Sequence, residues 1–374
     1  MKTYILSAFL LGICFTACTT GQPKDYPSFS LEDISAIKPD AEYPLDSLVT
    51  DMEVIPLETT DDCLIDGVGI VQESKDYYFI FSPKKESLLK FDKKGKFISK
   101  ISSYGQGPKE FIDIKQMELD NDRQELYIMD YMGRKMKIFD FDGNFLRDFP
   151  LPEEYSFTNF HLSPTEQAVY YVSSNNAVTP DLLKYDIKSG TSQVLSKHDR
   201  EMEIGEAFLG STYFTETDAG LFMYHYYNDM VFLLKDNQLV PNHLLVLGDR
   251  CIPWEDVGAS ALTNPKPQVL KIQLNDLKNI KDKICLFYTV IRYDGKSRKD
   301  FMAMYNPEKE GIYPHVNLVS NRFLSIKDAA PFTNGYNRES IFRVISPESL
   351  DETFLNRYGI TEDDNPVIVK YLLR

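Results

Sequence analysis

The sequence predicts an all-β fold, a six-bladed β-propeller of four-stranded blades that is closed by strands from both termini. Two observations predict it. First, Tyr77–Ile101 and Glu125–Phe149 align without a gap at an offset of 48 positions, and each copy holds two short apolar runs joined by a glycine-containing turn. A strand repeat of this length is typical of a propeller blade. Second, unmatched strand-like runs at Leu48–Leu57 and Pro366–Leu372 can complete one blade together, which leaves no exposed sheet edge there.

The two repeat copies define the first blades, at roughly 64–102 and 112–151. In the second copy, Asp142-Gly143 separates two alternating runs, and Lys94-Gly95 takes the equivalent place in the first. Asp-Gly at such a position is a strong hairpin signal because both turn residues favour φ > 0. Weaker copies mark four later blades, at Leu182–Tyr185, Met230–Leu234, Phe301–Tyr305 and Ile341–Ile345.

One interval between these runs is longer than the others and predicts an insertion near 248–281. It holds Trp254, the single tryptophan, and its segment Pro267–Ile280 has apolar residues near a helical period. The expected organisation is therefore a signal peptide at 1–17, a tether at 18–42 and the propeller at 43–374.

The N-terminus predicts export. Lys2 precedes the apolar run Tyr4–Ala17, which is too short to span a membrane and suits a secretory signal. The ending Thr16-Ala17-Cys18 resembles the lipobox of bacterial lipoproteins, which implies cleavage before Cys18 and a lipid on its thiol. The alternative is an ordinary signal peptide with an incidental cysteine.

Three cysteines remain in the expected mature chain: Cys63, Cys251 and Cys285. They allow at most one disulfide and a spare thiol, and buried thiols are the other interpretation. The net charge of −15 and the lack of a basic patch argue against nucleic acid as a partner. They also argue against adsorption to an anionic membrane, so we expect membrane contact through the lipid.

Several segments together resemble a known family. They are Phe91–Phe97, Tyr104–Phe111, Met52–Thr59 (MEVIPLET) and Asn365–Tyr371 (NPVIVKY). With them the chain resembles the six-bladed, NHL-like β-propeller lipoproteins of bacterial outer membranes. The resemblance implies a lipid anchor in the outer membrane, on either its periplasmic or its surface face. It also implies a link to glycan capture or uptake, and it brings no catalytic residues.

Candidate ligand-binding residues come from two loops and one strand. Gln106, Lys109 and Glu110 lie in the glycine-rich connection between blades one and two, which could equally be a simple closing turn. Trp254 could stack on a sugar or pack the insertion onto the propeller. Tyr224 and Tyr226 alternate in a strand and could line the central funnel or pack between blades.

No catalytic or metal motif is present. Asp120-Asn121-Asp122 is acidic enough for calcium but lacks the pattern of an EF-hand loop, so a hairpin turn is the favoured interpretation. We therefore expect no cofactor, with calcium as the alternative. The predicted function is a non-catalytic binding or scaffold module for a glycan, a peptide or a partner envelope protein. The alternatives are a metal-dependent lactonase, lyase or hydrolase with calcium at the funnel, and a structural or sensor role.

Overall fold

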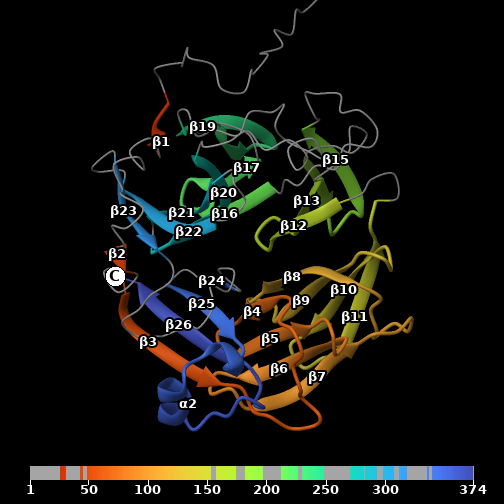
Figure 1. The fold of residues 1–374 in the computed structure, drawn as a ribbon. Coiled ribbons are helices and arrows are strands. Elements are labelled where there is room, and N and C mark those ends of the chain that lie inside the picture. Colours follow the sequence, from red (N-terminus) through yellow and green to blue (C-terminus); the bar gives the residue numbers. More distant parts are fainter. Residues whose placement is uncertain are drawn as a thin grey trace, which may run out of the picture.

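Six blades of four strands each lie around a common centre, as the sequence predicts, and two of the six sheets gain a fifth strand at their edge (Figure 1). The computed structural model describes residues 26–30, 43–44, 49–152, 157–173, 182–196, 212–225, 230–247, 270–281, 283–292, 298–306, 311–317, 335–336 and 339–373. Among the described residues, no helix is long and apolar enough to cross a membrane.

The first three blades follow the chain from the centre outward. Blade one is β4 (Val71–Glu73), β5 (Tyr77–Ser82), β6 (Ser87–Asp92) and β7 (Phe97–Ser103). Blade two is β8 (Ile114–Asp120), β9 (Glu125–Asp130), β10 (Lys135–Asp140) and β11 (Phe145–Pro150). Blade three is β12 (Phe157–Ser163), β13 (Ala168–Ser173), β14 (Leu182–Asp186) and β15 (Thr191–Ser196).

The last three blades recruit strands from the N-terminal segment. Blade four is β16 (Thr212–Thr217), β17 (Gly220–His225), β18 (Met230–Lys235) and β19 (Gln238–Val246), with β1 (Ser28–Ser30) at its edge. Blade five is β20 (Leu270–Ile280), β21 (Lys283–Arg292), β22 (Arg298–Asn306) and β23 (Gly311–Asn317), with β2 (Tyr43–Pro44) at its edge. Blade six is β24 (Gly335–Tyr336), β25 (Ser340–Ile345), β26 (Val367–Leu373) and β3 (Val49–Pro56).

The predicted closure is confirmed in blade six. The N-terminal strand β3 pairs antiparallel with β26, with Ile55 opposite Ile368 and Met52 opposite Tyr371. The two strands therefore bring together the terminal motifs MEVIPLET and NPVIVKY. Beside them, the buried Asn365 amide donates to the carbonyl oxygens of Glu58 and Cys63, at 2.7 and 2.8 Å.

The repeat is explained by its turns. Asp140 accepts hydrogen bonds from the N–H groups of Asp142 and Asn144, and Gly143 has φ 85°. The same turn in blade one uses the Asp92 carboxylate and Gly95, whose φ is 82°. A carboxylate closes the turn and a glycine takes the left-handed conformation, so both residues recur at the offset of 48.

The core consists of apolar clusters between neighbouring blades. In the described part of the chain, one such cluster fills each of the six blade junctions. The cluster of blades one and two includes Phe79 and Phe139, and that of blades four and five includes Phe222 and Tyr288. Each blade is thus buried on both faces by its neighbours.

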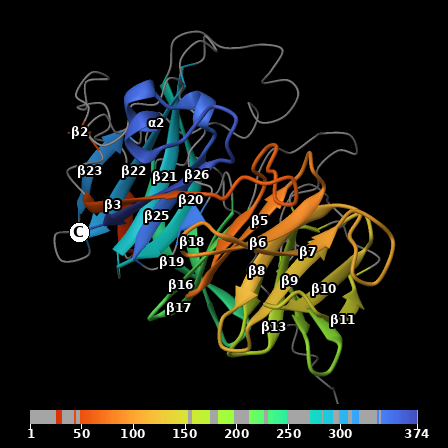
Figure 2. The ribbon, with the colours of Figure 1, turned by 90° about the horizontal axis from the view of Figure 1, so that it is seen from below.

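Three sequence expectations need correction. The tether predicted at 18–42 contains β1, which pairs with β19 and carries the fully buried Phe29, so part of it belongs to the propeller. The segment with a helical period ends in the long strand β20 (Leu270–Ile280). The last marker run, Ile341–Ile345, is the second strand of blade six rather than the third, because the connection to β26 holds η6 (Pro347–Ser349) and α2 (Glu352–Tyr358) (Figure 2).

Candidate functional site

The inner strands of the blades surround the centre of the propeller, where neighbouring first strands contact one another. The edge of an inner strand has no strand partner on that side, so its N–H and C=O groups need other partners. Side chains of β8 supply them to β12. The Gln116 side chain donates to the carbonyl oxygen of Phe160 at 2.7 Å and accepts from its N–H at 2.7 Å. Glu118 accepts from the N–H of Leu162 at 2.8 Å.

The same arrangement continues around the centre. The Asn159 amide on β12 donates to the carbonyl oxygen of Thr212 on β16, at 3.1 Å. The Lys278 ammonium on β20 donates to the carbonyl oxygen of Phe214 at 3.0 Å. Asn279 donates its backbone N–H to the hydroxyl of Thr215 at 2.6 Å. Most of these polar side chains therefore have a structural role, because they hydrogen-bond the backbone N–H and C=O groups along the edges of the inner strands.

His161 on β12 is different. Its Nδ1 lies 3.5 Å from a carboxylate oxygen of Glu118 in blade two, and its Nε2 lies 3.6 Å from one of Glu216 in blade four. The ring stacks on Phe214, with centroids 5.5 Å apart. Nε2 is buried and has no hydrogen-bond partner among the described residues. We name Glu118, His161, Glu216, Asp276 and Lys278 the channel cluster.

Burial shapes the charges of the channel cluster. It raises the pKa of the Glu118 carboxyl, and the nearby His161 and the Leu162 N–H offset this only in part. Burial likewise raises the pKa of Asp276, opposed by Lys278, whose ammonium lies 3.0 Å from the carboxylate. Glu216 is half exposed at 49 %. The cluster thus combines carboxylate acceptors, an imidazole and an ammonium, and these groups can hydrogen-bond a polar ligand.

Glu73, a buried glutamate outside the channel cluster, has a pKa shifted in the opposite direction from that of Glu118. Glu73 on β4 accepts from Lys93 and Lys370 at 2.5 and 2.7 Å, and from the hydroxyl of Tyr78 at 3.2 Å. Burial alone would favour its protonation, but the hydrogen bonds from both ammonium groups outweigh this and lower its pKa. Because Lys370 lies on β26, this ion cluster joins blade one to blade six and is structural.

The predicted loop site at Gly105–Glu110 is a self-closed turn. The Glu110 carboxylate accepts from the N–H of Gly107 at 2.8 Å, and the Lys137 ammonium donates to the carbonyl oxygens of Gly107 and Pro108. A Cβ on Gly105 would lie 2.0 Å from the Glu110 carboxylate, so the glycine makes room for it. Glu110 therefore holds the turn together, while Gln106 and Lys109 are exposed.

This loop and the channel cluster lie towards opposite ends of the propeller axis. The loop leads into the start of β8, whereas Glu118 lies near the end of β8. His161 and Glu216 likewise lie in the second halves of β12 and β16. The predicted loop residues Gln106, Lys109 and Glu110 therefore lie away from the channel cluster. The missed sequence signal for that cluster was the polar residues alternating along the inner strands.

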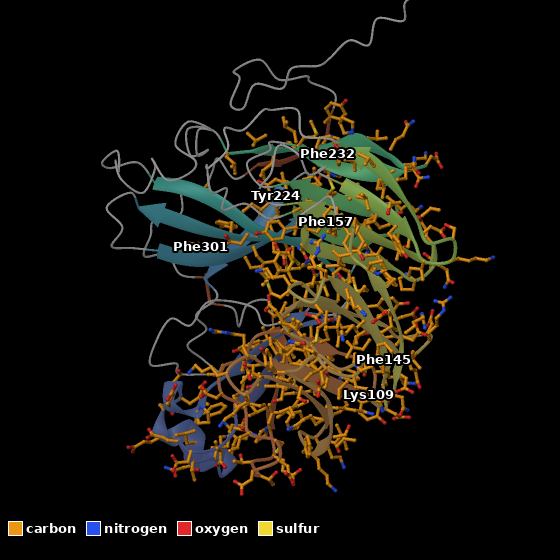
Figure 3. The ribbon with its side chains drawn as sticks, turned by 90° about the vertical axis from the view of Figure 1, so that its right-hand side faces the viewer. Lys109, Phe145, Phe157, Tyr224, Phe232 and Phe301 are labelled. Atoms are coloured by element: carbon orange, nitrogen blue, oxygen red, sulfur yellow. The ribbon has the colours of Figure 1, made fainter. Side chains whose placement is uncertain are left out.

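Tyr224 is buried, at 2 % exposure, in the cluster between blades four and five. Packing between blades, the alternative that its pattern allowed, therefore describes its environment. In Figure 3 it lies in the opposite half of the molecule from Lys109. Tyr226, Trp254 and Cys18 lie outside the described residues, so their predicted roles stay predictions.

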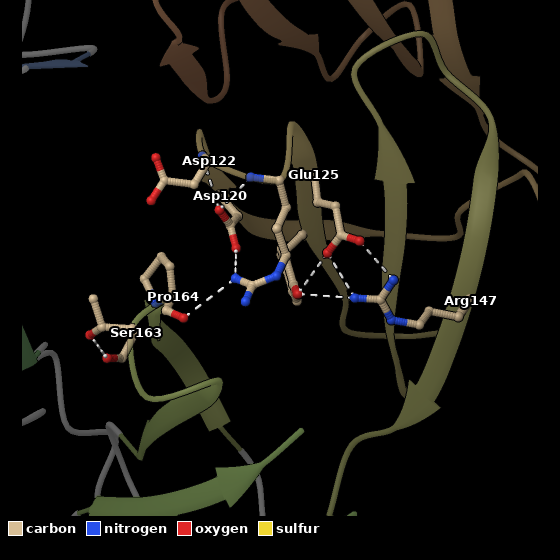
Figure 4. Close-up of polar contacts among 9 residues, drawn as sticks. Asp120, Asp122, Glu125, Arg147, Ser163 and Pro164 are labelled. Carbon is tan, nitrogen blue, oxygen red and sulfur yellow. Dashed lines mark hydrogen bonds and ion pairs between the residues drawn. The ribbon is translucent and has the colours of Figure 1, made fainter. Parts of the chain in front are cut away.

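The acidic turn after β8 is an ordinary hairpin turn. One Asp120 oxygen accepts from the N–H groups of Asp122 and Arg123, and the other accepts from the Arg123 guanidinium at 2.7 Å (Figure 4). Close by, Arg147 donates both terminal nitrogens to Glu125. Within the described ranges, no three His, Cys, Asp or Glu side chains gather so that they could hold a metal ion.

Two of the three expected mature-chain cysteines are buried free thiols, Cys63 and Cys285. Burial raises the pKa of the Cys285 thiol to about 12, so it stays protonated and unreactive at neutral pH. Cys251 lies outside the described residues.

The molecule is a six-bladed β-propeller with a closing N-terminal strand. The family model described as a domain of unknown function, DUF4934, matches residues 31–371, and the chain belongs to this family. No match was found among curated proteins.

Solved structures share the fold at low identity. A Bacteroides fragilis protein provisionally described as exported is 16 % identical, with a TM-score of 0.67 over 93 % of this chain and 99 % of that one. A DUF4221 family member from Bacteroides vulgatus is 10 % identical, with a TM-score of 0.57 over 87 % of this chain and 97 % of that one. These identities show the fold alone.

Proposed function

We propose that this protein is a lipid-anchored, non-catalytic propeller of the bacterial outer membrane that binds a neutral, hydroxyl-rich ligand, such as a glycan, in its channel cluster. The observation that carries the proposal is His161, held between two carboxylates with an unpartnered, buried Nε2 in the described structure. A ligand hydroxyl could donate to one nitrogen or accept from it. Leaving a buried polar atom without a partner is costly, so a bound ligand would recover that cost.

Charge supports a neutral ligand over an anionic one. The cluster has three carboxyl groups against one ammonium, and the whole chain carries a net charge of −15. An anion would meet repulsion from both, whereas sugar hydroxyls can donate to carboxylates and accept from Lys278 and His161. The lipobox-like ending at Cys18 supports the anchor, and a structural relative that is described as exported agrees with it.

A glycan array probed with purified Cys18→Ser protein tests the ligand, and isothermal titration then measures the affinity of each positive glycan. We expect His161→Gln to weaken binding by about 10- to 100-fold while leaving the melting temperature close to that of the parent. Lys109→Ala is the matched control at the other end of the axis. Loss of affinity with Lys109→Ala alone would favour the loop with Gln106 and Glu110 instead. A large rise in melting temperature with calcium would favour the metal-dependent enzyme.

The anchor has its own test. Cys18→Ala should release the protein from the membrane fraction or block its processing. A variant that is processed and sediments with membranes like the parent would contradict lipidation. Trp254→Ala, compared with the parent on any confirmed glycan, then tells whether this tryptophan adds a stacking contact or only packs.

A further inference from the structure

The N-terminal segment that follows the predicted lipidation site packs against one side of the propeller, at blade four. Strand β1 pairs parallel with β19, and the N–H of Leu244 donates to the carbonyl oxygen of Pro27 at 2.9 Å. Phe29 is fully buried there. Its ring stacks on His243 at a centroid distance of 4.4 Å and meets the edge of Tyr305 at 4.6 Å. The attachment point therefore lies at the rim of blade four, against blade five.

The chain between this point and Cys18 is short. Only eight steps separate Cys18 from Tyr26, the first described residue. Even a fully extended chain of that length spans no more than about 29 Å. Without the docked strand, the next attachment would be β2 at Tyr43, which allows a reach of about 90 Å.

The outer strands of the blades also differ in charge around the rim. No Asp, Glu, Lys or Arg occurs in the fourth strands β15 (TSQVLS), β19 (QLVPNHLLV) and β23 (GIYPHVN) of blades three to five, or in the edge strands β1 (SFS) and β2 (YP) that lie outside β19 and β23. The outer strands of blades six, one and two all carry charges, in β3 (VTDMEVIP), β7 (FISKISS) and β11 (FLRDFP). The described strands without charged residues are therefore centred on blade four, where β1 docks.

From these two observations we propose that the rim of blades three to five is the surface that faces the lipid bilayer carrying the anchor. The inference rests on the lipid anchor of the proposed function. Bringing charged strands close to a lipid surface costs desolvation. The strands of blades three to five avoid this cost, and the docked Phe29 keeps them there. With the rim against the membrane, the bilayer itself would cover neither end of the propeller axis.

Energy transfer to a headgroup-labelled lipid tests this orientation. The full lipidated protein, in a Cys251→Ser background, is reconstituted in vesicles and labelled at one introduced cysteine. The two sites are Val240→Cys on β19 and Ile98→Cys on β7, which are exposed by 42 % and 45 %. In a ring of six blades, blade one lies opposite blade four, so these sites are matched in exposure and opposed in position. We expect transfer from Val240→Cys to be several-fold more efficient than from Ile98→Cys.

Two variants show whether the docked strand causes the asymmetry. Inserting about 15 Gly/Ser residues after Gly21 lengthens the linker between Cys18 and β1 and changes no residue of the propeller. This insertion should strongly reduce the difference in energy transfer between the two labelled sites. Phe29→Asp should do the same by releasing β1. Equal energy transfer from both sites in the parent would overturn the proposal. So would an unchanged difference between the two sites in the variant with the longer linker. If the parent does not sediment with vesicles at all, the lipid anchor itself is wrong, and sedimentation distinguishes that failure from a wrong orientation.

Discussion

Blades one and two share a core built from their own strands, whereas blades four and five share a core that a distant segment completes. Between blades one and two, Phe79 contacts Phe141 at a centroid distance of 4.9 Å, and both belong to the repeat copies or their turns. Between blades four and five, Phe29 of the N-terminal segment joins the core and stacks on His243. The two strict copies of the repeat are thus the two blades that build a shared core from their own strands.

The largest expected effect is a difference in the free energy of unfolding between variants of these two cores. Truncating a buried phenylalanine costs about 3–5 kcal/mol of the free energy of unfolding. Phe79→Ala should lower global stability by that amount, because Phe79 cannot leave its site unless its blade unfolds. Phe29→Ala should lower the global value by less, because β1 can undock while the blades stay folded. Denaturant unfolding of both variants measures the difference.

Hydrogen exchange adds the local readout for this pair. The Leu244 amide donates to Pro27 on the docked segment, so its exchange should accelerate strongly in Phe29→Ala and little in Phe79→Ala under native conditions. Equal global losses with no local acceleration at Leu244 would show that the N-terminal segment is as inseparable from the fold as a blade strand.

Much of the fold follows from the sequence because the repeat encodes its own turns. Asp92, Gly95, Asp140 and Gly143 recur for a reason that is visible in the structure. The apolar residues before Ile280 have a nearly helical spacing although they form a strand, because β20 contains a bulge between Leu274 and Asp276. One extra residue in a strand changes the spacing of its apolar side chains from two to three, which resembles a helix.

The candidate site could not be predicted in the same way. Glu118, His161 and Glu216 come from three different blades and are 43 and 55 residues apart. No short motif joins them, and only the assembled ring brings them within 3.6 Å. Phe29 was missed for a related reason, since its partners on β19 and β22 lie more than 200 residues away.

A smaller effect should distinguish the two repeat copies from each other. Gly95 and Gly143 have the same left-handed conformation, but an added Cβ would meet different neighbours. At Gly95 it would lie 2.0 Å from the carbonyl oxygen of Pro56 in the closing strand β3, and at Gly143 the nearest atom is a methyl carbon of Ile101 at 3.2 Å. Gly143→Ala should cost about 1–2 kcal/mol from backbone conformation alone.

Gly95→Ala should cost more, about 2–4 kcal/mol, because backbone atoms of the closing strand must also move. Urea unfolding of the two variants side by side measures this. Equal losses would show that the turn of blade one does not brace the closure, even though Glu58 donates to the Gly95 carbonyl oxygen at 2.8 Å.

The smallest expected effect is a pH dependence of the free energy of unfolding that arises in the core between blades four and five. Burial between Phe29, Phe222 and Tyr305 lowers the pKa of His243 to about 4, and its Nδ1 has no hydrogen-bond partner among the described residues. In the unfolded chain a histidine has a pKa of about 6.5. The folded state therefore binds fewer protons than the unfolded state below pH 6.5. Stability from this group is complete above that pH and is lost as the pH falls towards 4.

His243→Phe removes the titration and keeps a ring for Phe29 to stack on. Between pH 7 and pH 5 the parent should lose about 1–2 kcal/mol more of its free energy of unfolding than this variant. The comparison with the variant cancels the carboxyl groups that titrate in both proteins, including Glu118 and Asp276. Denaturant unfolding at the two pH values gives the difference, and parallel losses would mean that the pKa of His243 is the same in the folded and unfolded states. A smaller loss in the parent than in the variant would mean that protonation strengthens the contact with Phe29, as a cation–aromatic contact.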